Sequence, residues 1–264
     1  MGEGALRVSV ATLCRVTFDH PAEHRLWLAL ERRATFRPEP PPHTIVVAVP
    51  YGGAVRILRP EALAAVVPDF RYDSERSKTE QDFRIVIPPT TWPAVREFCL
   101  AHIAAPDDNI LDNSPDRELK EEFVETLGVE VAPGDYAASA VGTVVEDGAA
   151  PTNSDRAPGA PTVRIYRLFE VRLLAPSLVE AIMASTLLDE ATLAARAEAQ
   201  SALGGRGRAN AAVGLPLAAV REALRLLPPQ ARALTFTVGE QRMDGTVSAL
   251  FPDLAGPARR WLAA

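Results

Sequence analysis

Cysteine is scarce in this chain of 264 residues, which contains only Cys14 and Cys99. Neither has a second cysteine close by in sequence, so the chain lacks the CxxC pair that binds zinc or exchanges disulfides. Two isolated cysteines are typical of free thiols in a reducing compartment. We therefore expect a cytoplasmic protein without disulfide bonds.

Long apolar runs are also missing. No window approaches the roughly 18 apolar residues that a membrane-spanning helix needs. The first twenty residues lack a charged start followed by an apolar stretch, and Leu6 replaces the Ser or Thr of a myristoylation signal. The sequence predicts neither a signal peptide nor a membrane partner.

Excess positive charge is absent as well. The formal net charge is -6, whereas affinity for nucleic acid comes mostly from Lys and Arg that neutralise phosphates. This argues against general nucleic-acid binding. No GxSxG motif occurs, and none of the four histidines has an evident catalytic partner in the sequence.

The residues that are present predict an α+β fold in three segments. Residues 1–41 are expected to form an N-terminal helical segment, because residues 20–36 combine an apolar side with a charged side. Residues 42–175 carry the strand patterns of an α/β domain. Residues 176–264 read as a mostly helical C-terminal extension, with one late strand near residues 233–238.

Within the middle segment, local signals predict individual elements. Two β-branched runs flank Gly52-Gly53 and predict a hairpin. The polar stretch 69–82 reads as an exposed loop. Further strands are expected near residues 83–89, 136–147 and 161–174, the last with one slip in its alternation near Leu168; helices are expected near residues 60–67, 90–103 and 115–127.

The helix expected from Ser114 to Gly128 has an unusual charge pattern. Five carboxylates lie between Asp116 and Glu125. Ser114-Pro115 is a typical helix start, and a glycine such as Gly128 is a typical helix end. A helix that only needed to be soluble would mix its charges.

Four glutamates of this helix share one face. At 100° per residue they occupy an arc of roughly 100°, opposite an apolar stripe. The glutamates are Glu118, Glu121, Glu122 and Glu125, and the stripe is Leu119, Phe123 and Leu127. Like charges at these spacings destabilise a helix, and a bound divalent cation would offset that repulsion.

The stretch RELKEE, Arg117 to Glu122, resembles the core of the Nudix box, G-x5-E-x7-R-E-U-x-E-E-x-G-U, in which U is apolar. The resemblance implies a Nudix-like mixed sheet flanked by helices over roughly residues 42–175. It also implies that the glutamates bind Mg²⁺ or Mn²⁺ and that Arg117 orients a carboxylate.

The chain departs from the box at three positions. Asn109 stands where the pattern has its first glutamate, Ile103 stands at its first glycine, and Val124 stands at its last glycine. A second register, shifted by four residues, recovers a glycine at Gly128 but places Glu121 at the arginine. Both registers remain open at this point.

Two functions follow from this pattern. The first is a metal-dependent hydrolase that cleaves a diphosphate linkage in a nucleotide-type substrate. Its catalytic residues would be Glu121, Glu122 and Arg117. Its metal ligands would be Glu118, Glu121, Glu122 and Glu125. Its substrate contacts would be Arg164 and Arg167, which otherwise form the solvent face of a strand.

The second function is a Nudix-like module without catalysis, which senses a small phosphorylated ligand or binds a protein. The Ala/Leu-rich helices of the C-terminal segment would supply a surface for a protein partner or a second copy of the chain. A third reading is an unrelated α+β fold in which the acidic helix is simply solvated.

Overall fold

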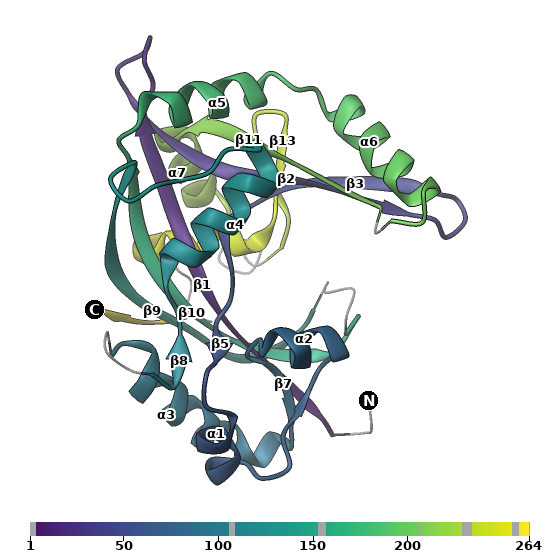
Figure 1. The fold of residues 1–264 in the computed structure, drawn as a ribbon, viewed down its shortest axis with the longest axis vertical. Coiled ribbons are helices and arrows are strands. Elements are labelled where there is room, and N and C mark those ends of the chain that lie inside the picture. The colour runs from purple at the N-terminus through teal and green to yellow at the C-terminus, as the bar shows by residue number, and fades with distance from the viewer. Residues whose placement is uncertain are drawn as a thin grey trace.

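A computed structural model of the protein describes residues 4–105, 109–152, 157–205, 207–228, 234–254 and 259–263. Within these residues twelve strands form one mixed sheet (Figure 1). They are β1 (Leu6–Asp19), β2 (Leu26–Arg37), β3 (His43–Val49), β4 (Tyr51–Ala54), β6 (Arg71–Tyr72), β7 (Arg84–Ile87), β9 (Tyr136–Pro151), β10 (Pro161–Leu173), β11 (Arg208–Pro216), β12 (Phe236–Val238), β13 (Gln241–Met243) and β14 (Arg260–Ala263). A separate short ladder joins β5 (Arg56–Ile57) to β8 (Leu111–Asp112).

Helices cover both faces of this sheet. They are α1 (Pro60–Val66), α2 (Glu75–Glu80), α3 (Trp92–Ile103), α4 (Pro115–Leu127), α5 (Pro176–Thr186), α6 (Glu190–Ala202) and α7 (Leu217–Leu226). Short 3-10 turns span Pro89–Thr91, Gly245–Leu250 and Pro252–Leu254. Helices and strands therefore combine in one mixed α+β architecture, as the sequence predicts.

Strand β1 is the centre of the sheet. Along one edge it pairs in parallel with β10, from Arg7 to Thr17. Along the other edge it pairs in turn with β7, β4 and β2, all antiparallel. The longest path through the sheet is β12-β13-β3-β2-β1-β10-β9-β14.

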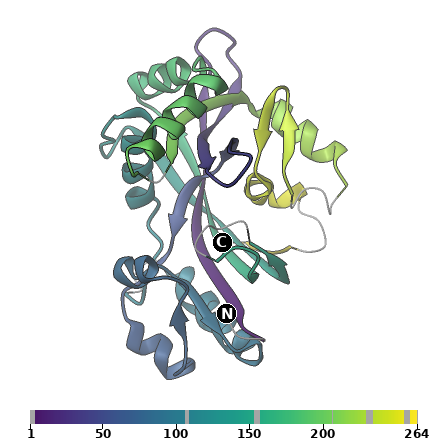
Figure 2. The same ribbon diagram turned by 90° about the vertical axis from the view of Figure 1, so that its right-hand side faces the viewer.

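The side chains of β1 alternate between two apolar cores. Cys14, Val16 and Phe18 belong to a core that includes residues of α4 and α5. Leu13 belongs to a core built around α7 and the C-terminal strands. Figure 2 shows α4 and α5 on one side of the central strands and α7 on the other. This alternation is what strands buried on both faces require.

Residues 55–105 and 109–112 form a lobe inserted between β4 and α4, visible at the lower end of Figure 1. The lobe contains α1, α2, α3, β6 and β7, and it has its own apolar core. Val8 and Val10 of β1 are part of that core. Strand β1 is therefore shared by the lobe and the main sheet.

The prediction of a helical segment over residues 1–41 is wrong, because β1 and β2 occupy it. Leu28, Ala29 and Leu30 are consecutive and all fully buried. A central strand covered on both faces has no polar side, so its Leu- and Ala-rich sequence imitates a helix. Pairing with β3 and β11 on its two edges overrides that local preference.

The predicted hairpin about Gly52-Gly53 is also wrong. Strand β3 pairs with β2 and β4 pairs with β1, so the two runs enter different ladders. Gly52 and Gly53 lie inside β4 rather than in a turn. The polar stretch 69–82, predicted as a loop, contains β6 and α2. The Ser74 side chain starts α2 by accepting the Ser77 N–H.

The C-terminal segment is helical only in part. α5, α6 and α7 form as predicted, but Arg208–Pro216 form strand β11, which pairs with β2 within the sheet. The apolar faces of these helices are buried, through Leu178, Ile182, Leu193, Val220 and Leu224. A protein partner at these helices stays a prediction. None of the helices in the described residues has both the length and the apolarity needed to cross a bilayer.

Other predictions are confirmed. The helices α1, α3 and α4 and the strands β7, β9, β10 and β12 form close to their predicted positions. The slip in alternation appears as a register shift between Leu168 and Phe169 in the β9–β10 ladder. These elements carry strong local signals, and their tertiary partners agree with those signals.

Candidate functional site

Helix α4 is held in place by its ends and by two apolar side chains. The Ser114 hydroxyl accepts the Asp116 N–H at 3.2 Å, and Gly128 closes the helix in the left-handed conformation. Leu119 and Phe123 are fully buried. The Phe123 ring stacks on the Tyr51 ring with centroids 5.0 Å apart. The carboxylate face of α4 is thus fixed relative to β4.

The four glutamates that were predicted to share one face of α4 divide into two pairs. Glu118 is buried, at 3% exposure, and Glu122 is partly buried. Glu121 and Glu125 are exposed. The buried side of the helix therefore includes Glu118 as well as the apolar stripe. Two of the four glutamates are directed at the sheet, and the other two are solvated.

Glu118 lies against the backbone of β4. A Cβ atom on Gly53 would stand 2.0 Å from Glu118 Oε2, so a side chain at position 53 would require this carboxylate to move. Arg117 Nη2 lies 2.5 Å from Glu118 Oε1, but without the angles of a hydrogen bond. Glu118 Oε1 is buried and accepts no hydrogen bond. Burial raises the pKa of Glu118 to about 7, against the opposing charge of Arg117.

Arg117 connects the carboxylates to the start of the helix. Its Nε donates to Asp112 Oδ2 at 3.1 Å, and its Nη2 donates to the Ala54 carbonyl at 3.0 Å. Its Nη1 lies 3.7 Å from Glu121 Oε2. The prediction that Arg117 orients a carboxylate fits these contacts, which involve Asp112, Glu118 and Glu121.

Glu122 faces a second acidic residue, Glu31 of β2. Glu31 is fully buried, and Arg33 donates to it from Nε at 3.1 Å and from Nη2 at 2.5 Å. Burial raises the pKa of Glu122 well above its ordinary value, the charge of Glu31 raises it further, and Arg33 opposes both. Glu122 Oε2 is buried without a hydrogen-bond partner. Two carboxylates thus share one guanidinium.

The exposed glutamates have weaker partners. Glu121 lies 3.4 Å from Arg56 of the inserted lobe. Glu125 accepts from the Asn210 amide of β11 at 3.3 Å. Ion pairs this exposed contribute little to stability. Glu121 and Glu125 form the solvent side of the site.

Sequence reasoning missed Glu31 and Arg33, because it assigned them to a helix. In a helix, residues two apart point in different directions, whereas in a strand they share a face. The alternation of Glu31 and Arg33 was the available signal. It was hidden by the consecutive apolar residues that precede it.

The two predicted substrate arginines do not come together. Arg164 and Arg167 are three residues apart on β10, so the pleat directs them to opposite faces of the sheet. Arg164 lies 3.7 Å from Glu146. Arg167 is on the same face as α4 and lines a pocket beside the start of that helix.

The box positions that depart from the pattern lie away from this face. Ile103 is buried in the core of the inserted lobe, and Asn109 is exposed. Gly53, by contrast, touches Glu118 directly. The glycine next to the carboxylates comes from β4, ahead of the inserted lobe.

The donor set is chemically suited to a hard cation, since it consists of carboxylate oxygens, two of which are buried and accept no hydrogen bond. It is not assembled into a closed cage. In the described part of the chain, no three His, Cys, Asp or Glu side chains are grouped so that they could hold a metal ion.

Comparisons with protein-family models, with curated proteins and with solved structures found no match to this chain.

The contact between Gly53 and Glu118 leads to a prediction. Gly53→Ala should lower the free energy of unfolding by about 1–3 kcal/mol, because the new methyl group must displace a buried carboxylate. Gly148→Ala is the matched control, since nothing lies within 4 Å of a Cβ there. Urea denaturation of both variants measures the effect. Equal stabilities would mean that Glu118 does not rest on β4.

Proposed function

We propose that the protein is a Nudix-like hydrolase that uses Mg²⁺ or Mn²⁺ to cleave a diphosphate linkage in a nucleotide-type substrate. One observation carries the proposal. Glu118 and Glu122 lie one helical turn apart, and each has a buried carboxylate oxygen that accepts no hydrogen bond. Glu118 Oε1 has the charge of Arg117 beside it. Buried carboxylate oxygens that accept no hydrogen bond are costly. A divalent cation would offset that cost and lower both pKa values.

The residues have separate roles in this proposal. Glu118 and Glu122 would hold the cation, with Glu31 beside Glu122 as a further acidic group. Glu121 and Glu125 remain candidate ligands on the solvent side. Arg117 would keep Glu118 and Asp112 in position. A bound divalent cation supplies Lewis acidity toward a phosphoryl oxygen and activates water.

The position of Gly53 also supports the resemblance to the Nudix box. Read along the sequence, the first box glycine falls on Ile103. In space, the glycine that packs on Glu118 is Gly53. The proposal is that residues 55–112 interrupt the box between its glycine and its helix. Such an interruption would account for Ile103 and Asn109 at box positions, but not for Val124 at the last box glycine. It would favour the register that begins at Arg117.

A second candidate is a module of the same fold that binds a ligand without cleaving it. It is favoured by the lack of a closed set of three ligands among the described residues, and by the guanidinium of Arg33, which already neutralises part of the acidic cluster. If the box is read along the sequence without an interruption, Asn109 stands at the position of a box glutamate, which agrees with this reading.

Metal binding separates the first proposal from a solvated helix. Isothermal titration of Mg²⁺ and Mn²⁺ should detect binding to the wild type and none to the double variant Glu118→Gln/Glu122→Gln. Glu130→Gln is the control, since Glu130 is exposed beyond the end of α4. Equal binding by the double variant would remove the proposed site.

Thermal melting adds a test in which the order of stability of the wild type and the double variant reverses when metal is added. Without metal, the double variant should melt above the wild type, because two buried carboxylates lose their charge. At Mg²⁺ concentrations about 100 times the dissociation constant, the wild type should gain about 2.7 kcal/mol and melt above the variant. Parallel shifts in EDTA and in Mg²⁺ would contradict the proposal.

Turnover then separates the enzyme from the binding module. Nucleotide sugars, dinucleotides and nucleoside triphosphates would be incubated with protein and Mg²⁺, and release of monophosphate or phosphate would be measured. Release that depends on Glu118 and Glu122 identifies the hydrolase. A thermal shift with a ligand that stays intact identifies the module.

A further inference from the structure

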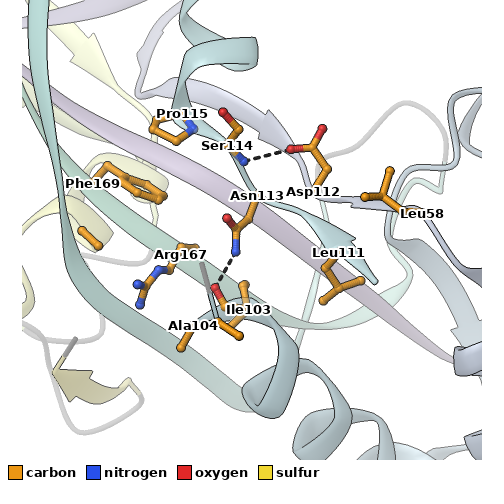
Figure 3. Close-up of a pocket in the computed structure, with 12 residues that line it drawn as sticks. Leu58, Ile103, Ala104, Leu111, Asp112, Asn113, Ser114, Pro115, Arg167 and Phe169 are labelled. Atoms are coloured by element: carbon orange, nitrogen blue, oxygen red, sulfur yellow. Dashed lines mark hydrogen bonds between the residues drawn. The ribbon is translucent and has the colours of Figure 1, made fainter. Parts of the chain in front are cut away.

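A pocket of about 360 Å³ lies at the start of α4, on the side of the helix toward β9 and β10. Three parts of the chain line it: the residues that lead into α4, the inserted lobe, and the pair β9–β10. Figure 3 shows Arg167 and Phe169 of β10 together with Asn113 and Ser114 at the helix start and Leu58 and Leu111 from the lobe. Its volume is that of a site for a small molecule.

Arg167 is a buried cation that lines this pocket, and it has no acidic partner in the part of the chain that the structure describes. Arg167 is 6% exposed. Its Nε has no hydrogen-bond partner, and its Nη1 makes one long contact, 3.5 Å to Thr143 Oγ1. The guanidinium lies 5.7 Å from the centre of the Phe169 ring. Burial lowers the pKa of Arg167. A buried cation left in this state is costly unless an anion pairs with it.

The positive end of α4 borders the same pocket. α4 has 13 residues, and Ser114 and Pro115 at its start are lining residues. Asp112 also lines the pocket, but its two oxygens are engaged by the Arg117 guanidinium and the Ser114 N–H, each at 3.1 Å. The pocket therefore combines a guanidinium with the positive end of the α4 dipole, both of which favour anions. The N–H groups of Ser114 and Asp116 are already bonded, to Asp112 and to the Ser114 hydroxyl, and Pro115 has none.

The pocket and the carboxylates of α4 share one face of the sheet. Gly53 of β4 is opposite Thr12 of β1, and Thr12 is opposite Arg167 of β10. Two strand spacings separate Gly53 from Arg167, about 10 Å. The Thr12 hydroxyl donates to the Asn113 carbonyl between them, at 3.0 Å. The start of α4 lies between the pocket and the carboxylates.

We infer that this pocket binds a small phosphate monoester with an aromatic or apolar body. The phosphate would lie between Arg167 and the start of α4. The body would pack on Phe169 and on the apolar residues of the inserted lobe, including Leu58 and Leu111. A phosphate dianion suits the site better than a carboxylate, because its two negative charges face the Arg167 guanidinium and the positive end of the α4 dipole together. The inference does not require metal or hydrolysis at Glu118 and Glu122.

The test uses the full chain in EDTA, so that its result is independent of the proposed metal site. Phenyl phosphate is titrated by calorimetry, with phenylacetate and benzyl alcohol as carboxylate and neutral counterparts. Phenyl phosphate should bind, phenylacetate should bind more weakly, and benzyl alcohol should not bind measurably. Lack of phenyl phosphate binding, or equal binding of all three, would overturn the inference.

Three arginine variants locate the site. Arg167→Met should weaken phenyl phosphate binding at least tenfold, while its melting temperature without ligand stays equal or rises, because a buried unpaired charge is removed. Arg172→Met is the matched control on the same strand, since Arg172 pairs with Asp19 at the exposed end; its binding should be unchanged. Arg167→Lys keeps the charge without the guanidinium fork, so its affinity for phenyl phosphate should lie between those of the wild type and Arg167→Met. Unchanged affinity in Arg167→Met would show that the pocket is not the binding site.

Discussion

Phe123→Ala should lower the free energy of unfolding by about 3–5 kcal/mol, the cost of removing a buried aromatic ring from a core. Phe123 is fully buried and stacks on Tyr51, so neither α4 nor β4 can easily collapse into the space left behind. Denaturant unfolding followed by circular dichroism measures the change. The prediction treats α4 as part of the core and not as a surface helix.

The neighbouring residue supplies the control. Val124 is 49% exposed and points away from the sheet. Val124→Ala should therefore change stability by no more than about 0.5 kcal/mol. Comparable losses in the two variants would mean that α4 is not docked through Phe123. The acidic face would then have no fixed position relative to β2 and β4.

The second large effect is a pH dependence of stability due to Glu118. Burial raises its pKa from 4.5 to about 7. Between these values the native protein binds more protons than the unfolded chain. The free energy of unfolding should therefore fall as pH rises from 4.5 through 7, by an amount on the order of 3 kcal/mol from this one group. Glu122, whose pKa is also raised, should act in the same direction.

The difference between wild type and Glu118→Gln isolates the effect from that of other groups. At pH 5 the two proteins should be nearly equal in stability, because the native carboxyl is protonated. At pH 8 without metal, the variant should be the more stable. Urea denaturation at both pH values gives the comparison. A constant difference across this range would show that Glu118 ionises normally and lacks the desolvated environment described above.

Much of the fold could be predicted from local signals, and the failure at β2 has a clear physical cause. Helix α4 was predicted with both ends, because Ser114, Pro115 and Gly128 act within a few residues of the helix. Strand β2 was predicted as a helix, because its state depends on β3 and β11, and β11 lies about 180 residues away in the sequence. A single sequence does not reveal which distant strand will pair.

The candidate site was predicted in part for the same reason. The spacing of Glu118 and Glu122 on a helix is a local property, and both were chosen. The contributions of Gly53, Glu31 and Arg33 depend on which strands lie under α4, and none of them was chosen. Arg164 and Arg167 were grouped by charge, whereas the pleat of β10 separates them. Helix periodicity alone could not show that Glu118 would be buried.

The parallel pairing of β1 with β10 has a consequence for how the protein folds during synthesis. β1 ends at Asp19, but its partner β10 is complete only at Leu173, and β2 must wait for β11, which ends at Pro216. Pairings this distant close large loops and make folding slow. The first two strands, which carry Glu31 and Arg33, must remain unpaired on those edges while most of the chain is made. An N-terminal fragment that ends before Pro161 should therefore expose apolar strand edges and aggregate, whereas the full chain covers them.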